Sequence, residues 1–368
     1  MNHLVLRQEG AVRFYAPDPE KYGGIYSAPV FYNPLMEKNR TLSVLVLRSF
    51  GTGLTVCEPL SGSGVRGLRY AVESGSVGRL ILNDVSKEAV AVIKKNLELN
   101  GVDADVYNED ANVLLHRLKG ACDVVDVDPF GSPAPFLHAA FRALREEGLL
   151  CATATDTAVL VGRYPRKCLR RYGSVVRKTP FYIELGLRNL LRYIARVAAS
   201  EDFYIEPLLS YWERHYFRIC VYSVKGARDA DDVFRHMGHV MYHRKERRVA
   251  QFPSQHTSGP LWIGPLGDPL FIHRMSTFDR YSEFLQLLEL EYSVHAPWLY
   301  RLPEFAVDGK SPTLKEALAM LKEAGIYATA THMASDGIKT EEGYGEVFRH
   351  IGHVMYHRKE RSAKVDKT

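Results

Sequence analysis

Short apolar runs alternate with longer segments of helical periodicity between residues 54 and 155. The expected strands are Leu54–Pro59, Arg79–Asn83, Ala104–Tyr107, Ala121–Val127 and Leu149–Thr155, and the expected helices between them are Leu68–Ser74, Ser86–Asn100, Ala111–Leu118 and Pro135–Arg145. Continuous apolar strands separated by helices are typical of a parallel sheet that is covered on both faces. The pattern therefore predicts an α/β, doubly wound domain whose ligands bind at the carboxyl ends of the strands.

The pattern changes after residue 180. An amphipathic helix is expected at Tyr182–Ala199, and two alternating runs, Ile205–Trp212 and His215–Val224, predict an antiparallel hairpin on the sheet edge. The polar, Gly-containing stretch Lys225–Asp232 marks a boundary. We therefore expect a first domain at 1–225 and a second, smaller α+β domain at 226–368.

The composition is that of a globular protein. Hydrophobic residues make up 46% and charged residues 25%, and the net charge of +5 allows a strongly basic surface in one region only. No apolar run approaches the roughly 18 residues of a membrane-spanning helix, and the first ten residues lack the apolar core of a signal peptide. Five cysteines occur without a C-x-x-C pair: Cys57, Cys122, Cys151, Cys168 and Cys220. They predict buried free thiols in a reducing, cytoplasmic compartment rather than disulfides or a zinc site.

One segment occurs twice. Residues 233–247 (VFRHMGHVMYHRKER) recur at 347–361 with a single difference. A solenoid needs several stacked units whose sequences keep a shared pattern, so one near-identical pair does not predict a structural repeat. A recent duplication or a sequence artefact is the better interpretation, and the second copy carries little functional weight.

A Gly-rich turn, Gly62-Ser63-Gly64-Val65-Arg66-Gly67, follows the first expected strand. Such glycines let the backbone turn tightly and bring N–H groups close to a ligand, although many Gly-rich turns are purely structural. Asp84 ends the next strand, where a carboxylate accepts hydrogen bonds from both hydroxyls of a ribose. Together they favour a cofactor that contains adenosine, and they leave open whether it is NAD or S-adenosylmethionine.

Two further acids follow later strands. Asp110 either caps the next helix or accepts a hydrogen bond from an adenine amino group. Asp128 is followed by Pro129 and Phe130. A carboxylate and the Pro129 carbonyl would accept the two hydrogens of a base amino group and turn its delocalised lone pair toward an electrophile, while Phe130 stacks on the base. This loop favours amino methylation over a helix cap, and an NAD-dependent oxidoreductase does not need it.

With these residues in view, the chain resembles the tRNA (guanine-26 N2) dimethyltransferase family. The matching segments run in order along nearly the whole chain: Val30-Phe31-Tyr32-Asn33-Pro34 with Asn39-Arg40, Ser63–Gly67, Asn83–Ser86, Asp110–Asn112, Asp128–Pro133, Thr153–Asp156, Gly259–Trp262 and Gly337–Thr340. The resemblance implies a class I, Rossmann-like methyltransferase domain that transfers two methyl groups in succession from S-adenosylmethionine to N2 of guanine 26 in tRNA. It implies no metal.

The resemblance also implies roles for individual residues. It places Arg40, Arg66, Asp84, Asp110 and Ala111 in the cofactor site, to which the Gly-rich turn adds Gly62 and Gly64. Asp128 and Pro129 would hold the amino group of a base that has left its stack, and Phe31 and Phe130 would clamp that base from its two faces. Taken alone, Phe31 predicts a hydrophobic anchor for the N-terminal segment.

The second domain departs from many relatives, because it lacks the cysteine pairs that suggest a zinc site in them. His236, His239 and His243 would share one face of a helix and could bind a metal, but the resemblance suggests a strand or loop there. We favour RNA binding by cations in this domain: Arg244, Lys245, Arg247, Arg248 and Lys339. Two other hypotheses remain open: a non-catalytic RNA-binding protein on a methyltransferase scaffold, and an NAD-dependent oxidoreductase.

Overall fold

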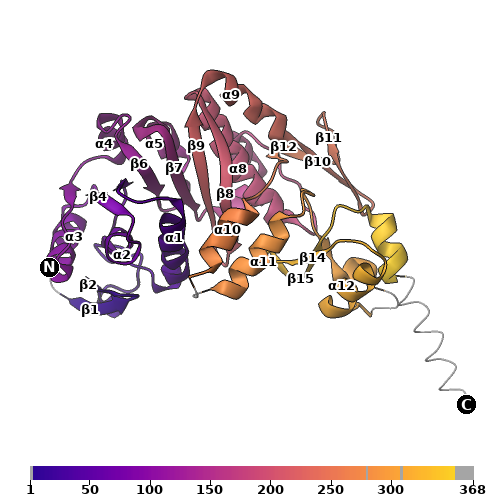
Figure 1. Ribbon diagram of the computed structural model, residues 1–368, viewed down its shortest axis with the longest axis horizontal. Coiled ribbons are helices and arrows are strands. Elements are labelled where there is room, and N and C mark those ends of the chain that lie inside the picture. Colours follow the sequence, from indigo (N-terminus) through magenta and orange to yellow (C-terminus); the bar gives the residue numbers. More distant parts are fainter. Residues whose placement is uncertain (1–2, 279–280, 307–309, 353–368) are drawn as a thin grey trace, which may run out of the picture.

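A seven-stranded mixed sheet is the largest sheet of the computed structural model, which describes residues 3–278, 281–306 and 310–352 (Figure 1). Its strands are β3 (Leu54–Glu58), β4 (Val77–Asn83), β5 (Asp105–Tyr107), β6 (Cys122–Val127), β7 (Leu144–Ala154), β8 (Phe203–Glu213) and β9 (Tyr216–Lys225). The spatial order is β5-β4-β3-β6-β7-β9-β8, with β3 to β7 parallel and β9 antiparallel to both neighbours. The chain order reverses between β3 and β6, so their carboxyl ends form the crevice in which doubly wound sheets bind ligands.

Helices cover this sheet and connect its strands. They are α1 (Glu37–Phe50), α2 (Val65–Glu73), α3 (Lys87–Asn100), α4 (Ala111–Arg117), α5 (Leu137–Ala143), α6 (Thr157–Leu160), α7 (Pro165–Tyr172) and α8 (Tyr182–Ser200). The predicted limits of α3 are confirmed: the Ser86 hydroxyl accepts the N–H of Ala89, and Gly101 ends the helix at φ +61°. The doubly wound arrangement and the hairpin β8–β9 at the sheet edge are confirmed as well.

An N-terminal hairpin was not predicted. Strands β1 (Leu4–Glu9) and β2 (Val12–Pro17) pair antiparallel, and β2 packs against α2 and α3. The apolar run Leu42–Leu47 lies inside α1 and is buried along its whole length. In the described part of the chain, no helix is long and apolar enough to cross a membrane.

The second part of the chain carries two small sheets. One contains β10 (Met237–His243), β11 (Glu246–Ala250) and β12 (Thr257–Trp262), and the other contains β13 (Tyr300–Arg301), β14 (Thr329–Thr331) and β15 (Ala334–Lys339). The helices of this part are α9 (Ala227–Asp232), α10 (Pro269–Ser276), α11 (Ser282–Tyr292), α12 (Leu314–Glu323) and a helix at 344–352, and 3-10 turns lie at Val233–His236 and Leu302–Phe305. Three further 3-10 turns, at Pro19–Lys21, Pro34–Met36 and Ala134–Phe136, belong to the first part. Helix α8 packs against both β8 and β12 (Figure 1), so one apolar core runs through both parts.

The expectation of five free thiols was wrong for two cysteines. Cys151 on β7 and Cys220 on β9 face each other in the antiparallel ladder and form a disulfide. Cys57, Cys122 and Cys168 are free and buried, as expected. Cross-strand pairing brought together two residues that are 69 positions apart in sequence, and their spacing along the chain gave no sign of it.

The two copies of the repeat fold differently. In the first copy Val233–His236 forms a 3-10 turn and Met237–His243 forms strand β10. In the second copy residues 347–352 belong to a helix that spans 344–352, and the remainder lies outside the described residues. Strand β10 is held by β11 and β12 on its two sides, so tertiary pairing decides the conformation of this sequence.

Candidate active site

The Gly-rich turn and Asp84 meet at the carboxyl ends of β3 and β4. Gly62 N–H donates to Asp84 Oδ2 (2.9 Å), and Ser86 N–H donates to Asp84 Oδ1 (2.9 Å). Gly62 has φ +54°, and a Cβ there would lie 3.1 Å from the Phe31 carbonyl oxygen, so the turn needs glycine. Partial burial raises the pKa of Asp84 above its usual value, while the two backbone hydrogen bonds oppose this rise.

Asn83 joins three strand ends and was missed as a site residue. Its side-chain amide donates to the carbonyls of Pro59 (2.9 Å) and Glu109 (3.1 Å), and its side-chain oxygen accepts the N–H of Glu109 (3.0 Å). The residue is fully buried. An amide side chain at the end of a buried strand, next to an acid, was the available signal, because a buried amide must be hydrogen-bonded.

Asp110 caps helix α4, as one of its two interpretations predicted. Its Oδ1 accepts the N–H groups of Asn112 (2.9 Å) and Val113 (3.2 Å), and Ala111 begins the helix in a buried position. The cap places the Asp110 carboxylate at the end of β5. In the sheet β5 lies next to β4, and Asp84 follows β4. An adenine contact by Asp110 stays a prediction.

Asp128 lies at the end of β6 and is paired with Arg66. The Arg66 guanidinium also donates to Asn39 Oδ1 (2.8 Å) and Ser43 Oγ (3.1 Å) on α1. Arg66 is buried, whereas the Asp128 side chain keeps 22% of its surface exposed. Arg66 therefore holds one edge of a carboxylate whose other side faces solvent.

A second layer of charges lies beneath this pair. Asp126 receives two hydrogen bonds of 2.7 Å from Arg218 and one from the Tyr70 hydroxyl, and its Oδ2 lies 3.7 Å from Arg66 Nη1. Burial alone would raise the pKa of Asp126, but the charges of Arg218 and Arg66 outweigh it and lower the pKa to about 2. Asp126 therefore stays ionised and fixes the two guanidinium groups.

Glu58 completes this layer. Its Oε2 accepts the N–H of Gly67 (3.1 Å), and its Oε1 lies 3.4 Å from Arg66 Nε. Burial raises the pKa of Glu58 to about 8, with the charges of Asp126 and Asp128 adding to the rise against the opposing charge of Arg66. With Glu58 neutral at neutral pH, the remaining charges form two ion pairs, Arg66 with Asp128 and Arg218 with Asp126, so the charges of the cluster balance.

Arg40 is not free to serve as a cofactor ligand in this structure. Its Nε donates to Glu9 Oε1 (2.6 Å), and its Nη2 donates to Glu9 and to the Asn33 carbonyl (3.1 Å). The side chain is buried against the N-terminal hairpin. These contacts give Arg40 a structural role, and its expected contact with the cofactor stays a prediction.

The two aromatic rings of the predicted clamp touch each other. The centroids of Phe31 and Phe130 are 4.4 Å apart in an edge-to-face arrangement, and Tyr26 lies 6.0 Å from Phe31. Phe130 is 67% exposed. A base can enter between the two phenylalanines only after one of them moves, so the clamp stays a prediction that requires a rotamer change.

The five cations expected to bind RNA fall into two groups. Arg247 is fully buried, donates to both carboxylate oxygens of Glu304 (2.6 Å each) and lies over the Tyr300 ring, while buried Lys339 donates to Glu184 (2.6 Å). For these two the prediction was wrong, because their charges are neutralised inside the protein. Arg244, Lys245 and Arg248 are exposed on or beside the β10–β11 turn, where Lys245 also donates to the Glu304 carbonyl (2.8 Å).

The histidine metal site is not formed. His236 ends a 3-10 turn, whereas His239 and His243 lie on β10, so the three do not share a helix face. Among the described residues no group of three or more His, Cys, Asp or Glu is placed to hold a metal ion. The strand suggested by the resemblance is confirmed.

Fold and site together define a Rossmann-like methyltransferase domain with a second domain attached. A family model described as N2,N2-dimethylguanosine tRNA methyltransferase matches residues 10–352, and the chain belongs to this family. Its relatives include the tRNA (guanine(26)-N(2))-dimethyltransferases of Pyrobaculum aerophilum (72% identity over 94% of this chain and 96% of the relative) and Methanothermobacter thermautotrophicus (35% over 96% and 100%). The solved structure of Trm1 from Pyrococcus horikoshii with S-adenosyl-L-methionine superposes with a TM-score of 0.86 at 31% identity, covering 95% of this chain and all of that chain.

Proposed function

We propose that this protein transfers two methyl groups in succession from S-adenosylmethionine to N2 of guanine 26 in tRNA. The observation that carries the proposal is the position of Asp128. It is held by Arg66 on one side, open to solvent on the other, and followed by exposed Phe130 at the mouth of the crevice. The family membership and the named activities of the relatives support the same reaction.

The residues at the ends of β3 to β5 fit an adenosine-containing cofactor. Each Asp84 oxygen accepts one backbone N–H and keeps a further lone pair that can accept a ribose hydroxyl. Gly62 and Gly64 place no side chain at their positions in the turn, and Asp110 and Ala111 lie on the side where the adenine would bind. When bound, S-adenosylmethionine supplies an electrophilic methyl group on its sulfonium sulfur.

Asp128 orients the attacking nitrogen. The lone pair of guanine N2 is delocalised into the ring, so N2 is a weak nucleophile. It becomes a better one when its hydrogens are held in positions that turn the lone pair out of conjugation with the ring. Asp128 and the Pro129 carbonyl accept these hydrogens and direct the lone pair toward the methyl carbon. As the N–C bond forms and the C–S bond breaks, N2 loses one proton, which Asp128 or water accepts.

The second transfer uses the same residues with one hydrogen fewer. After the first transfer N2 carries one methyl group and one hydrogen, so a single acceptor suffices to orient it. The guanine must leave its stack to reach Asp128, at a cost of a few kcal/mol, and contact with Phe31 and Phe130 partly offsets this. We infer a cytoplasmic location from the tRNA substrate.

Incubation with unmodified tRNA and labelled S-adenosylmethionine tests this function. Nucleoside mass analysis over time should show N2-methylguanosine rising first and N2,N2-dimethylguanosine replacing it. A tRNA with adenine at position 26 is the matched control and should gain no label. Labelling of that control, or of another nucleoside in the natural tRNA, would contradict the proposed specificity.

A further inference from the structure

The net positive charge of the chain is concentrated in one segment that the predicted RNA-binding residues do not include. Residues 157–182 contain seven Lys and Arg and no Asp or Glu, so this segment has a net charge of +7, whereas the whole chain has a net charge of +5. The remainder of the protein is therefore net negative. These seven are Arg163, Arg166, Lys167, Arg170, Arg171, Arg177 and Lys178.

Helix α7 (Pro165–Tyr172) and the turn before it present four of these seven cations to solvent. The buried face of the helix contains Cys168 and Tyr172, whereas Arg163, Arg166, Lys167 and Arg170 are all exposed. None of these four forms an ion pair with another residue of the described ranges. Exposed cations that are not neutralised by the protein produce a strong local positive potential.

The buried face of α7 is attached to the candidate active site. The Tyr172 hydroxyl lies 2.6 Å from Ser132 Oγ and donates to Asp156 (2.8 Å to Oδ1), and Arg171 donates to the same carboxylate (2.7 Å). Ser132 belongs to the loop that follows Asp128, and Gly131 of this loop exchanges hydrogen bonds of 2.8 Å with Thr155 at the end of β7. The cations of α7 therefore project from the same edge of the sheet as Asp128.

The segment continues from α7 onto the three-stranded sheet. Val175 pairs with Gly259 on β12, and Arg177 Nε donates to the Thr257 carbonyl (2.9 Å). Strand β12 pairs with β10, whose turn into β11 carries exposed Arg244. A row of cations thus leads from the active-site loop onto the second part of the chain.

We propose that the exposed cations of residues 163–178, with Arg166, Lys167 and Arg170 at their centre, dock the phosphate backbone of the RNA substrate beside the methylated base. The proposal rests on the proposed function and names the surface that holds its substrate. A polyanion fits better than an acidic protein, since the cations are closely spaced and exposed Tyr164 and Leu169 lie among them to contact ribose or base. Attachment through Tyr172 and Asp156 ties the position of the backbone to the Asp128 loop.

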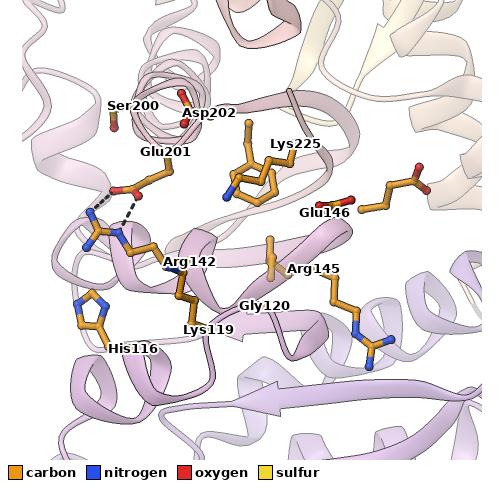
Figure 2. Close-up of a pocket in the computed structure, with 13 residues that line it drawn as sticks. His116, Lys119, Gly120, Arg142, Arg145, Glu146, Ser200, Glu201, Asp202 and Lys225 are labelled. Atoms are coloured by element: carbon orange, nitrogen blue, oxygen red, sulfur yellow. Dashed lines mark hydrogen bonds and ion pairs between the residues drawn. The ribbon is translucent and has the colours of Figure 1, made fainter. Parts of the chain in front are cut away.

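The test compares two triple variants with the same change in charge. The first is Arg166→Gln, Lys167→Gln, Arg170→Gln. The control is Lys119→Gln, Arg145→Gln, Lys225→Gln, whose residues line a cavity of about 950 Å³ at the amino ends of β6 and β7 (Figure 2). That edge is separated from Asp128 by the length of β6, about 20 Å. Both variants change exposed side chains, and their unfolding temperatures verify folding.

The measurement is the affinity of full-length protein for an unmodified tRNA transcript at several salt concentrations. We expect the α7 variant to bind about 10- to 100-fold more weakly at low salt, with the slope of log affinity against log salt reduced by about two to three. The control should keep the wild-type slope, and S-adenosylmethionine affinity should be unchanged in both. Equal slopes in the two variants would overturn the proposal and favour a protein partner for α7.

Nucleoside analysis of the wild type separates the two proposals. If the wild type methylates guanine 26 and the α7 variant keeps its KM for tRNA, the docking surface is wrong and the function stands. If the wild type forms no methylated guanine, the function is wrong, and the difference in salt slopes alone decides on the surface.

Discussion

At the level of single residues, Asp128 differs from the acids around it in being open to solvent. Asp126 and Glu58 are buried, and their oxygens are paired with Arg66, Arg218 and the Gly67 N–H. Asp128 has one side open to solvent, where a substrate can bind. The Arg66 guanidinium thus connects the Asp128 carboxylate to buried carboxylates whose positions are fixed. Such a support keeps a functional carboxylate in one orientation.

We expect Asp128→Asn to lower the rate of methyl transfer at saturating substrates by about 100-fold or more, because the amide is neutral and its nitrogen cannot accept a hydrogen. S-adenosylmethionine affinity, measured by calorimetry, should change less than about threefold. Asp105→Asn removes the same charge from an exposed ion pair with Arg79 and should be active. Wild-type turnover by Asp128→Asn would contradict the assigned role.

The raised pKa of Glu58, about 8, predicts a pH-dependent cost in stability. Glu58 is protonated in the folded protein and ionises near pH 4.5 when unfolded, so its contribution is fully present below pH 4.5 and is lost as the pH rises toward 8. Glu58→Gln has the shape of the protonated acid. Urea unfolding should show the variant more stable than wild type at pH 8, by roughly 4 kcal/mol, and nearly equal to it at pH 4.5. A difference that does not change with pH would contradict the explanation.

At the level of secondary structure, the succession of apolar runs and helical segments predicted the parallel strands well because β3, β6 and the second half of β7 are buried on both faces and mainly apolar. Strands β1 and β2 were missed because neither is buried along its whole length, and α7 was missed because its buried face contains only Cys168 and Tyr172. The charge run at 163–178 was visible in the sequence, but its position beside Asp128 depends on contacts made by Tyr172. Arg247 and Lys339 looked like surface cations because their partners, Glu304 and Glu184, are far away in sequence.

The disulfide between β7 and β9 makes a prediction at the same level. It closes a loop of 69 residues, which restricts the unfolded chain and stabilises the fold by about 2 to 4 kcal/mol. Reduction of the wild type should lower the free energy of unfolding in urea by that amount. The double variant Cys151→Ala, Cys220→Ala should match the reduced wild type and be insensitive to reductant. A wild type whose stability is the same with and without reductant would show that the bond is not formed.

At the level of the whole molecule, the two parts of the chain are joined by buried polar contacts as well as by apolar packing. On α8, Arg188 donates to the carbonyls of Trp262 (3.1 Å) and Gly264 (2.9 Å), and Glu184 pairs with Lys339 of β15. Helix α8 thus belongs to both parts. This arrangement holds the row of cations that starts at α7 in a fixed position relative to the Asp128 loop.

The buried ion pair between Glu184 of α8 and Lys339 of β15 leads to the last prediction. Lys339→Met removes a buried cation and leaves Glu184 with Arg188 as its charged partner, so we expect stability to fall by about 2 to 3 kcal/mol. Because one core spans both parts, calorimetry should show a single transition shifted to lower temperature, not a separate early transition of the second part.

Arg248→Gln removes an exposed cation from the same region and should leave stability within about 0.5 kcal/mol of wild type. Only Arg248→Gln should reduce the salt dependence of tRNA binding, since the Lys339 charge is already neutralised inside the protein; a reduced slope in Lys339→Met would return that residue to the RNA-binding surface.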